Sequence, residues 1–283
     1  MKVVRAILVM SLLSMGFPDF AQQVSNPSPT DSKIGSLSLD QILANLEQRN
    51  AQRAAALERF EGTRVYRMEY RGFPSDRDAE MTVKVAFQAP STKQFTVVSQ
   101  SGSKFVIDHI FKKLLEGEQE AAKGDNRNDT ALTRKNYDFE LAGVEKNPEG
   151  DQYVLNLLPK NKNKFLYRGK IWVDAKDFAV ARIQGEPGKN PSIWIKKTDI
   201  THSYKKVDGF WLPAENHTES FIRLGGKATL SIEYQNYSII KASSPHSART
   251  KTSKHVGDST LDGAATSDRS VWSNPLVGAD AFR

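Results

Sequence analysis

The sequence contains no cysteine, so disulfide bonds and thiolate chemistry are excluded. It also lacks a Gly-x-Ser-x-Gly, a P-loop and a dinucleotide-binding motif. The apolar run Ala6–Leu13 is too short to span a membrane. Lys and Arg give a net charge of +7 but are scattered along the chain, which argues against nucleic acid as a partner. The charge allows weak peripheral contact with an anionic membrane surface.

Histidines are few and offer little for catalysis. The five are His109, His202, His217, His246 and His255. His202 and His217 fall on neighbouring predicted strands, and His217 shares a strand face with Glu219, but a metal site needs a third ligand and tighter spacing. We interpret both histidines as exposed polar residues on strands. We predict no catalytic residue, no bound metal and no cofactor, and hence no enzymatic activity. A metal bound near His217 would favour the alternative of a cell-envelope enzyme.

The ends of the chain differ from its centre. Residues 1–21 read as a secretory signal peptide, with Lys2 and Arg5 before an apolar run, so we expect export to the periplasm. Residues 22–36 are polar and predict a disordered leader. Residues 241–283 are rich in Ser, Thr, Ala, Asp and Gly without periodicity and predict a disordered tail. The folded domain is therefore predicted over residues 37–240.

The centre of the chain is a ladder of runs with the period-2 alternation of β-strands. Short turn sequences separate the runs, so they predict hairpins and an antiparallel sheet. The predicted strands are Arg64–Tyr70, Met81–Phe87, Gln94–Ser99, Tyr137–Leu141, Tyr153–Leu158, Phe165–Val173, Phe178–Ile183, Ile193–Tyr204, Phe210–Ile222 and Ala228–Ile240.

Two segments have helical periodicity instead. Ser38 and Gln41 fit a capping box, and apolar residues recur from Leu39 to Phe60, so we predict one amphipathic helix ending near Gly62. Lys104–Lys123 predicts a second helix whose polar end frays. The sheet has more apolar positions on one face than a thin domain needs, so it must wrap around helices, a ligand or both. An incompletely closed barrel covered by helices fits, and the pattern leaves open whether an apolar cavity remains.

Several short motifs within Leu39–Ile240 resemble a known family as a set. They are Tyr137-Asp138-Phe139, Tyr153-Val154-Leu155, the octapeptide Tyr167–Asp174, Asn190–Trp194 and Phe210–Pro213. The chain resembles the periplasmic lipoprotein carrier LolA and its relatives, which include proteins named as outer-membrane lipoprotein-sorting proteins, LolB and the amino-terminal domain of RseB.

The resemblance implies a mainly β (α+β) fold, an open antiparallel half-barrel of about ten strands with two helices on the concave side. It implies a periplasmic carrier or binder of a lipid or lipoprotein acyl group, acting in outer-membrane lipoprotein sorting or envelope lipid transport. An inner-membrane donor and an outer-membrane acceptor would be its partners. The alternative within the same resemblance is an RseB-like sensor or scaffold that binds protein partners.

The candidate lining of an acyl-chain cavity follows from strand alternation and helix faces. These residues are expected to point to the concave side, although a register error of one residue would turn a whole strand over. They are Leu43, Leu46, Val83, Val85, Phe87, Phe95, Val97, Phe111, Leu114, Leu155, Leu157, Ile171 and Val173.

Overall fold

The computed structural model describes residues 37–89, 92–121, 129–190, 192–223 and 225–242. All of these residues belong to one unit of the chain, Ile34–Arg283. The predicted signal peptide and leader lie outside the described residues, as does the predicted tail from residue 243 onward. Those three assignments remain predictions.

Strands dominate the described chain and form a single ten-stranded sheet. All neighbouring strands pair antiparallel, in the order β3-β2-β1-β10-β9-β8-β7-β6-β5-β4. The strands are β1 (Leu57–Gly72), β2 (Arg77–Gln88), β3 (Thr92–Gly102), β4 (Tyr137–Glu145), β5 (Gln152–Pro159), β6 (Tyr167–Asp174), β7 (Val180–Pro187), β8 (Ile195–Val207), β9 (Phe210–Ile222) and β10 (Gly226–Lys241).

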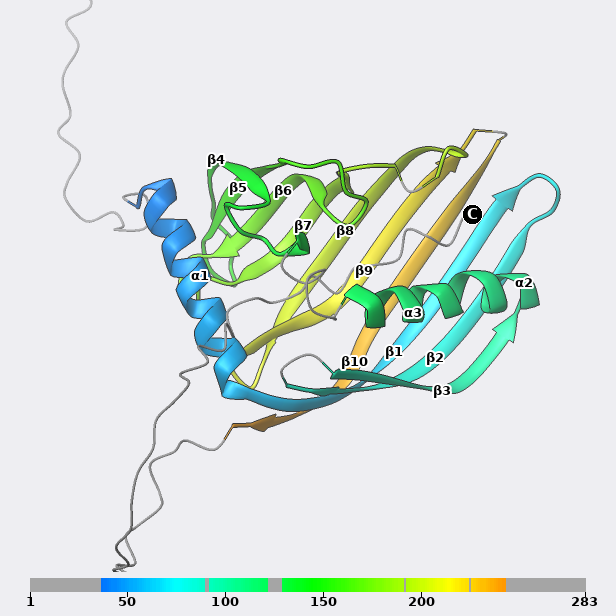
Figure 1. The fold of residues 1–283 in the computed structure, drawn as a ribbon, viewed down its shortest axis with the longest axis horizontal. Helices are drawn as coiled ribbons and strands as arrows, with labels where there is room; N and C mark the ends of the chain where they lie inside the picture. Colours follow the sequence, from blue (N-terminus) through cyan, green and yellow to red (C-terminus); the bar gives the residue numbers. More distant parts are fainter. Residues whose placement is uncertain (1–36, 90–91, 122–128, 191, 224, 243–283) are drawn as a thin grey trace, which may run out of the picture. The chain divides into compact units, whose positions relative to one another are not determined.

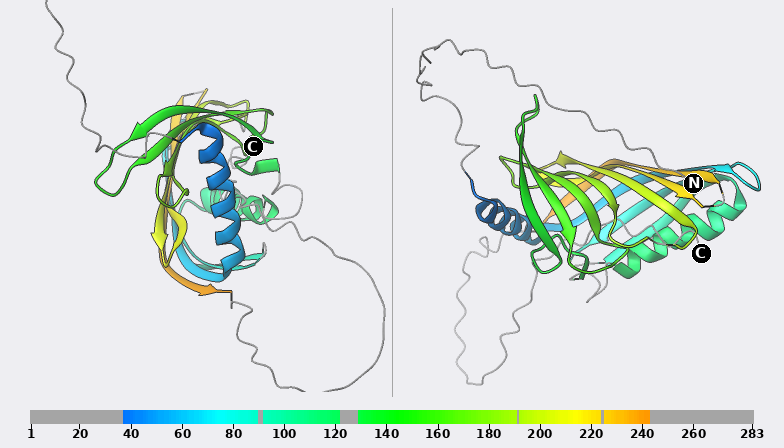
Figure 2. Two further views of the ribbon diagram at one scale, coloured as in Figure 1. Left: turned by 90° about the vertical axis from the view of Figure 1, so that its left-hand side faces the viewer. Right: turned by 90° about the horizontal axis from the view of Figure 1, so that it is seen from above.

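The sheet curves and does not close, because β3 and β4 at its two ends do not pair with each other. Figure 2 shows the sheet in profile, bent around the helices on its concave side. The first helix lies at the β4–β7 end, and the second crosses the β10, β1, β2 and β3 end (Figure 1). The predicted open half-barrel with two helices on its concave side is confirmed.

Helix α1 (Leu39–Ala56) begins with the predicted capping box, in which Ser38 accepts from the backbone of Gln41 and Gln41 accepts from the backbone of Ser38. It ends earlier than predicted, and Leu57 opens β1 instead. The prediction of a helix as far as Gly62 is therefore wrong. Strand pairing explains the difference, because Phe60 pairs with Ile239 of β10 on one side and with Phe87 of β2 on the other.

The second helix runs continuously through α2 (Lys104–Val106), a π-helical segment η2 (Ile107–Phe111) and α3 (Lys112–Ala121). The segment holds three buried side chains, Ile107, Ile110 and Phe111, against the sheet. In the described part of the chain no helix is long and apolar enough to cross a membrane.

Candidate functional site

Each helix covers its own apolar cluster on the concave face of the sheet. Under α1, the buried members are Ile42, Leu43, Leu46, Tyr137, Tyr153, Leu155, Leu157, Leu166, Tyr167, Ile171, Val173 and Ile183. Under the second helix, they are Tyr66, Met68, Ala79, Met81, Val83, Val85, Val106, Ile107, Ile110, Phe111, Leu114, Ala228, Leu230, Ile232 and Tyr234. We call these the α1 cluster and the α3 cluster.

The structure divides the predicted lining residues between these clusters. The α1 cluster takes Leu43, Leu46, Leu155, Leu157, Ile171 and Val173. The α3 cluster takes Val83, Val85, Phe111 and Leu114, with Phe95 packed against it.

Two predicted lining residues lie elsewhere. Phe87 packs against a third group formed by Leu57, Phe60, Phe210 and Leu212. Val97, near the free edge of the sheet on β3, is 47% exposed and joins none of the three groups. The predicted lining is thus two packed layers of sheet and helix rather than one continuous wall.

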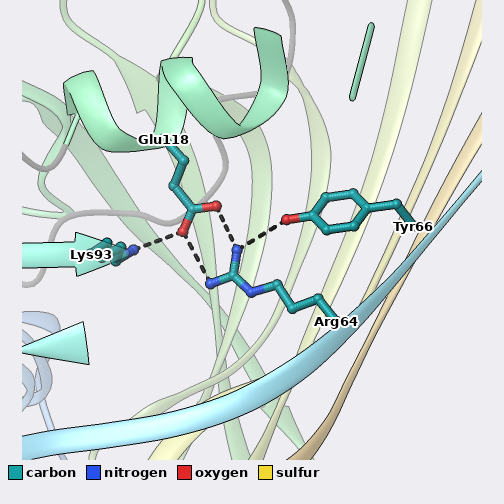
Figure 3. Close-up of polar contacts among 4 residues, drawn as sticks. All are labelled: Arg64, Tyr66, Lys93 and Glu118. Carbon is teal, nitrogen blue, oxygen red and sulfur yellow. Dashed lines mark hydrogen bonds and ion pairs between the residues drawn. The ribbon is translucent and has the colours of Figure 1, made fainter. Parts of the chain in front are cut away.

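A buried polar network ties the second helix to the sheet (Figure 3). Arg64 of β1 donates two hydrogen bonds to the carboxylate of Glu118 on α3, at 2.6 and 3.1 Å. Lys93 of β3 donates to the same carboxylate at 2.8 Å. Arg64 also donates to the hydroxyl of Tyr66 at 3.3 Å. Three elements that are distant in sequence therefore meet at one carboxylate.

Burial and charge compete in setting the protonation of this network. Burial disfavours the charged carboxylate of Glu118, but Arg64 and Lys93 outweigh burial and lower its pKa to about 2. Burial also disfavours the charged guanidinium of Arg64, yet Glu118 holds its pKa well above the usual value. The pKa of Tyr66 rises to about 12, chiefly through burial. Arg64 and Glu118 are therefore a charged pair at neutral pH, with Tyr66 neutral beside them.

Rings and a guanidinium line up across the concave face between the two clusters. The ring of His202 stacks on Tyr204 at 4.5 Å between centroids and faces Tyr234 at 5.9 Å. The guanidinium of Arg64 lies 4.9 Å from the ring of Tyr234 and 5.5 Å from the ring of Phe95. Tyr204 packs against the α1 cluster and Tyr234 belongs to the α3 cluster, so this row links the two.

His202 differs from its sequence interpretation. It is fully buried, so the prediction of an exposed strand residue is wrong for His202, whereas the side chain of His217 is 52% exposed. Burial first, and then the charge of Arg64, lower the pKa of His202 to about 3, so the imidazole is neutral. Its strand neighbour Asn216 is also buried.

Sequence reasoning missed Arg64 and Glu118 as well. Glu118 lies in the stretch predicted to fray, yet the helix continues and the side chain is buried. A usable signal existed for Arg64, because it alternates in phase with Tyr66 and Met68 on a predicted strand and so falls on the apolar face. An apolar-face arginine implies a buried anionic partner, although the sequence does not say which one.

The surroundings of His217 matter for the alternative of a metal-dependent cell-envelope enzyme. His217 Nε2 lies 3.6 Å from Glu219 Oε1, and Glu219 also pairs with Lys227. Across the described ranges, no group of three or more His, Cys, Asp or Glu side chains could hold a metal ion. The expected lack of enzymatic activity stays a prediction.

Comparison of the sequence with protein-family models and with curated proteins finds no match. Solved structures do match. One is a protein named as an outer membrane lipoprotein-sorting domain, from Vibrio parahaemolyticus, with 12% identity and a TM-score of 0.39 over 73% of this chain and 93% of that one. Another is a LolA superfamily protein from Nitrosomonas europaea, with 13% identity and a TM-score of 0.31 over 76% and 99% of the two chains.

A third match is MucB in its complex with MucA from Pseudomonas aeruginosa, with 10% identity and a TM-score of 0.25 over 68% of this chain and 93% of that one. A LolA superfamily protein, of the family that the sequence motifs resemble, is thus among the solved structures similar to this chain.

Proposed function

We propose that the protein is a periplasmic carrier or binder of a lipid or lipoprotein acyl group, held between the concave face of the sheet and the helices. The supporting observation is that both helices pack buried apolar side chains against the apolar face of the sheet, namely Ile42, Leu43 and Leu46 of α1 and Ile107, Ile110, Phe111 and Leu114 of the second helix. An acyl chain offers the sheet the same kind of surface, at roughly 0.8 kcal/mol per buried CH₂. An acyl chain could therefore take the place of the helix side chains against the sheet, and the contacts would remain apolar.

Polar contacts join α1 to other described residues near both of its ends. Arg134 donates to Asp40 at 2.7 Å near the start, and Arg53 donates to the backbone oxygens of Asp177 and Phe178 at 2.9 and 2.8 Å near the end. The second helix is similar, because its network at Glu118 lies close to the end of α3. Its first half contains the π-helical segment η2, a rare conformation that is frequent at functional sites.

Lipid binding by the full-length protein tests the proposal. The fluorescence of 1,6-diphenylhexatriene, a hydrocarbon probe, reports binding, and native mass spectrometry of protein purified from membranes identifies the bound lipid. We expect saturable binding by the wild type. Ile110→Ala on η2 removes helix packing from the closed form, so it should raise the population of the open form and the apparent affinity.

Leu158→Ala is the matched control, since Leu158 is 52% exposed on β5 and should not change binding. Absence of saturable binding by both the wild type and Ile110→Ala would overturn the proposal. Transfer of an acyl chain would require an inner-membrane donor and an outer-membrane acceptor, and cross-linking in cells would test these partners separately.

A second candidate function, binding of a protein partner, has an observation of its own. Strand β3 is an edge of the sheet and carries the exposed side chains Val97 and Val98. An exposed apolar edge strand can add a strand from another chain. Val98→Lys would weaken such pairing and leave lipid binding unchanged, so pull-down and probe binding of this variant distinguish the two functions.

A further inference from the structure

The strip between the two clusters contains two buried polar side chains that pair across strands. His202 of β8 and Asn216 of β9 are register partners, and they are 0% and 3% exposed. Both strands alternate, so His217 next to Asn216 turns to the other face and is exposed. His202 and Asn216 therefore lie side by side on the concave face.

Polar atoms of both side chains lack partners. Neither ring nitrogen of His202 forms a hydrogen bond with any described residue, and the same holds for the amide nitrogen of Asn216. Buried polar groups in folded proteins are almost always hydrogen-bonded, and each exception needs an explanation such as a missing bound group. Here three buried polar atoms without a hydrogen-bond partner lie on two neighbouring side chains.

The pair is held in place by contacts that leave these three atoms free. The hydroxyl of Thr218 donates to the side-chain oxygen of Asn216 at 3.1 Å, which fixes the amide and directs its nitrogen elsewhere. The His202 ring is stacked on Tyr204, with an interplanar angle of 5°, and faces Tyr234 at 20°. Orientation by neighbours, with the polar atoms unused, is the arrangement expected of a preorganised binding site.

The chemistry of the three atoms indicates what they can bind. A neutral imidazole presents one N–H donor and one acceptor nitrogen, and the Asn216 amide adds N–H donors. This set matches a group with an acceptor oxygen, a hydroxyl or an amide N–H. Arg64, the nearby cation, is already paired with Glu118, so it does not favour an additional anion.

We propose that His202 and Asn216 form a polar subsite that hydrogen-bonds an uncharged carbonyl, hydroxyl or amide group of the ligand, such as the ester or amide linkage that joins an acyl chain to its head group. The inference rests on the proposed function, since a ligand reaches this buried strip when a helix moves. The position suits that linkage, because Tyr204 leads to the α1 cluster and Tyr234 to the α3 cluster. The acyl chain would lie in one cluster while its linkage lies between the two.

Two probes separate the subsite from the apolar face. The hydrocarbon 1,6-diphenylhexatriene has no hydrogen-bonding group, and a monoacylglycerol, measured by its displacement of that probe, has an ester and hydroxyls. Asn216→Leu and His202→Phe replace the two side chains by apolar ones of similar shape in the full-length protein. Such replacements remove unsatisfied groups and are expected to leave thermal stability unchanged or higher.

We expect both variants to bind the hydrocarbon probe like the wild type and to bind the monoacylglycerol at least tenfold more weakly. His217→Phe, on the exposed face of β9, is the control and should change neither affinity. Unchanged monoacylglycerol affinity in both variants would overturn the subsite and leave the proposed function intact, and it would assign the three polar atoms to buried water. If the wild type binds the hydrocarbon but not the monoacylglycerol, the subsite also fails. No binding of either probe by the wild type would overturn the proposed function and the subsite with it.

Discussion

Arg64 and Glu118 are 54 residues apart in the sequence, and their side chains form two hydrogen bonds with only 5% and 7% of the side-chain surfaces exposed. The pair connects β1 to α3 at the edge of an apolar cluster. Ionic groups in such a place are expensive to bury, so each requires the other. The pair fixes where α3 lies on the sheet more than it adds to net stability.

Lys93 also donates to this carboxylate, so removal of Glu118 alone should be far more harmful than removal of all three charges. Glu118→Gln leaves the charge of Arg64 buried and should lower the free energy of unfolding by about 3–5 kcal/mol. The triple variant Arg64→Met, Lys93→Met, Glu118→Met removes all three charges of the network and should recover most of that loss. Urea denaturation measures both. The control is Glu80→Gln, which removes an exposed partner of Arg67 and should have little effect. A loss in the triple variant as large as in Glu118→Gln would contradict this account.

His202 should make the protein sensitive to mild acid. Its folded pKa is depressed to about 3 from an ordinary value of 6.5, so below pH 6.5 the unfolded chain binds a proton at this site that the folded chain does not. Stability is thus full above pH 6.5 and falls as the pH drops toward 3, by at most about 1.4 kcal/mol per pH unit from this residue.

Chemical denaturation at intervals between pH 6.5 and 5 checks this, because that range lies above the region where Glu118 titrates. His202→Gln should flatten the slope, and His217→Gln, at an exposed position, should not. An equal slope in wild type and His202→Gln would show that another group is responsible. Below pH 4.5, loss of the Glu118 carboxylate adds a further decline, which ends near pH 2.

The octapeptide motif Tyr167–Asp174 contains Gly169 because β6 and β7 approach each other closely at Gly169 and Gly185. The two are paired across β6 and β7, and a Cβ on Gly169 would lie 2.2 Å from the backbone oxygen of Gln184. Gly169→Ala should therefore cost more than the roughly 1–3 kcal/mol expected from its backbone conformation at φ +153° alone. Gly143→Ala is a matched control, since its φ is +146° but nothing lies within 4 Å of the added carbon. Thermal denaturation of the two variants isolates the clash, and equal losses would contradict it.

The sequence predicted the strands well where alternation and turns agree, and β9 matches its predicted bounds Phe210–Ile222. It failed at Leu57 and Phe60 for a physical reason. Their spacing of three residues suits a helix face, but a register shift between Leu57 and Arg59 in the pairing with β10 lets both side chains be buried from a strand. Periodicity alone cannot distinguish a helical turn from a bulged strand.

The candidate site was predictable only in part, because alternation assigns a face but not a partner. His202 falls in phase with Ile200 and Tyr204, so its burial could have been inferred. Its lack of a hydrogen-bond partner among the described residues could not, and neither could the meeting of Arg64 with Glu118. Those facts depend on how distant elements pack, which local patterns do not encode.

The last prediction concerns Leu155, a fully buried member of the α1 cluster. Leu155 is 0% exposed, and its register partners are Leu141 of β4 and Ile171 of β6. In Leu155→Glu the carboxylate would have no partner, so either it stays charged at a cost of several kcal/mol or it becomes neutral. A closed, packed core cannot hydrate it, and we therefore expect loss of the cooperative thermal transition. Leu158→Glu on the same strand, at a position 52% exposed, should melt like the wild type.

Lipid binding measured alongside unfolding distinguishes the closed cluster from an open cavity. If α1 lifts readily, water can reach the new carboxylate in the empty Leu155→Glu protein, which then stays folded while binding of the hydrocarbon probe is lost. Retained folding with lost binding would place the acyl chain in the α1 cluster and make α1 the mobile cover. Unfolding of Leu155→Glu together with normal probe binding by the wild type would instead favour the α3 cluster, where the π-helical segment lies, as the acyl-chain site. Retained folding with unchanged binding would contradict both assignments, because a charge at a fully buried position of the concave face would then affect neither packing nor ligand.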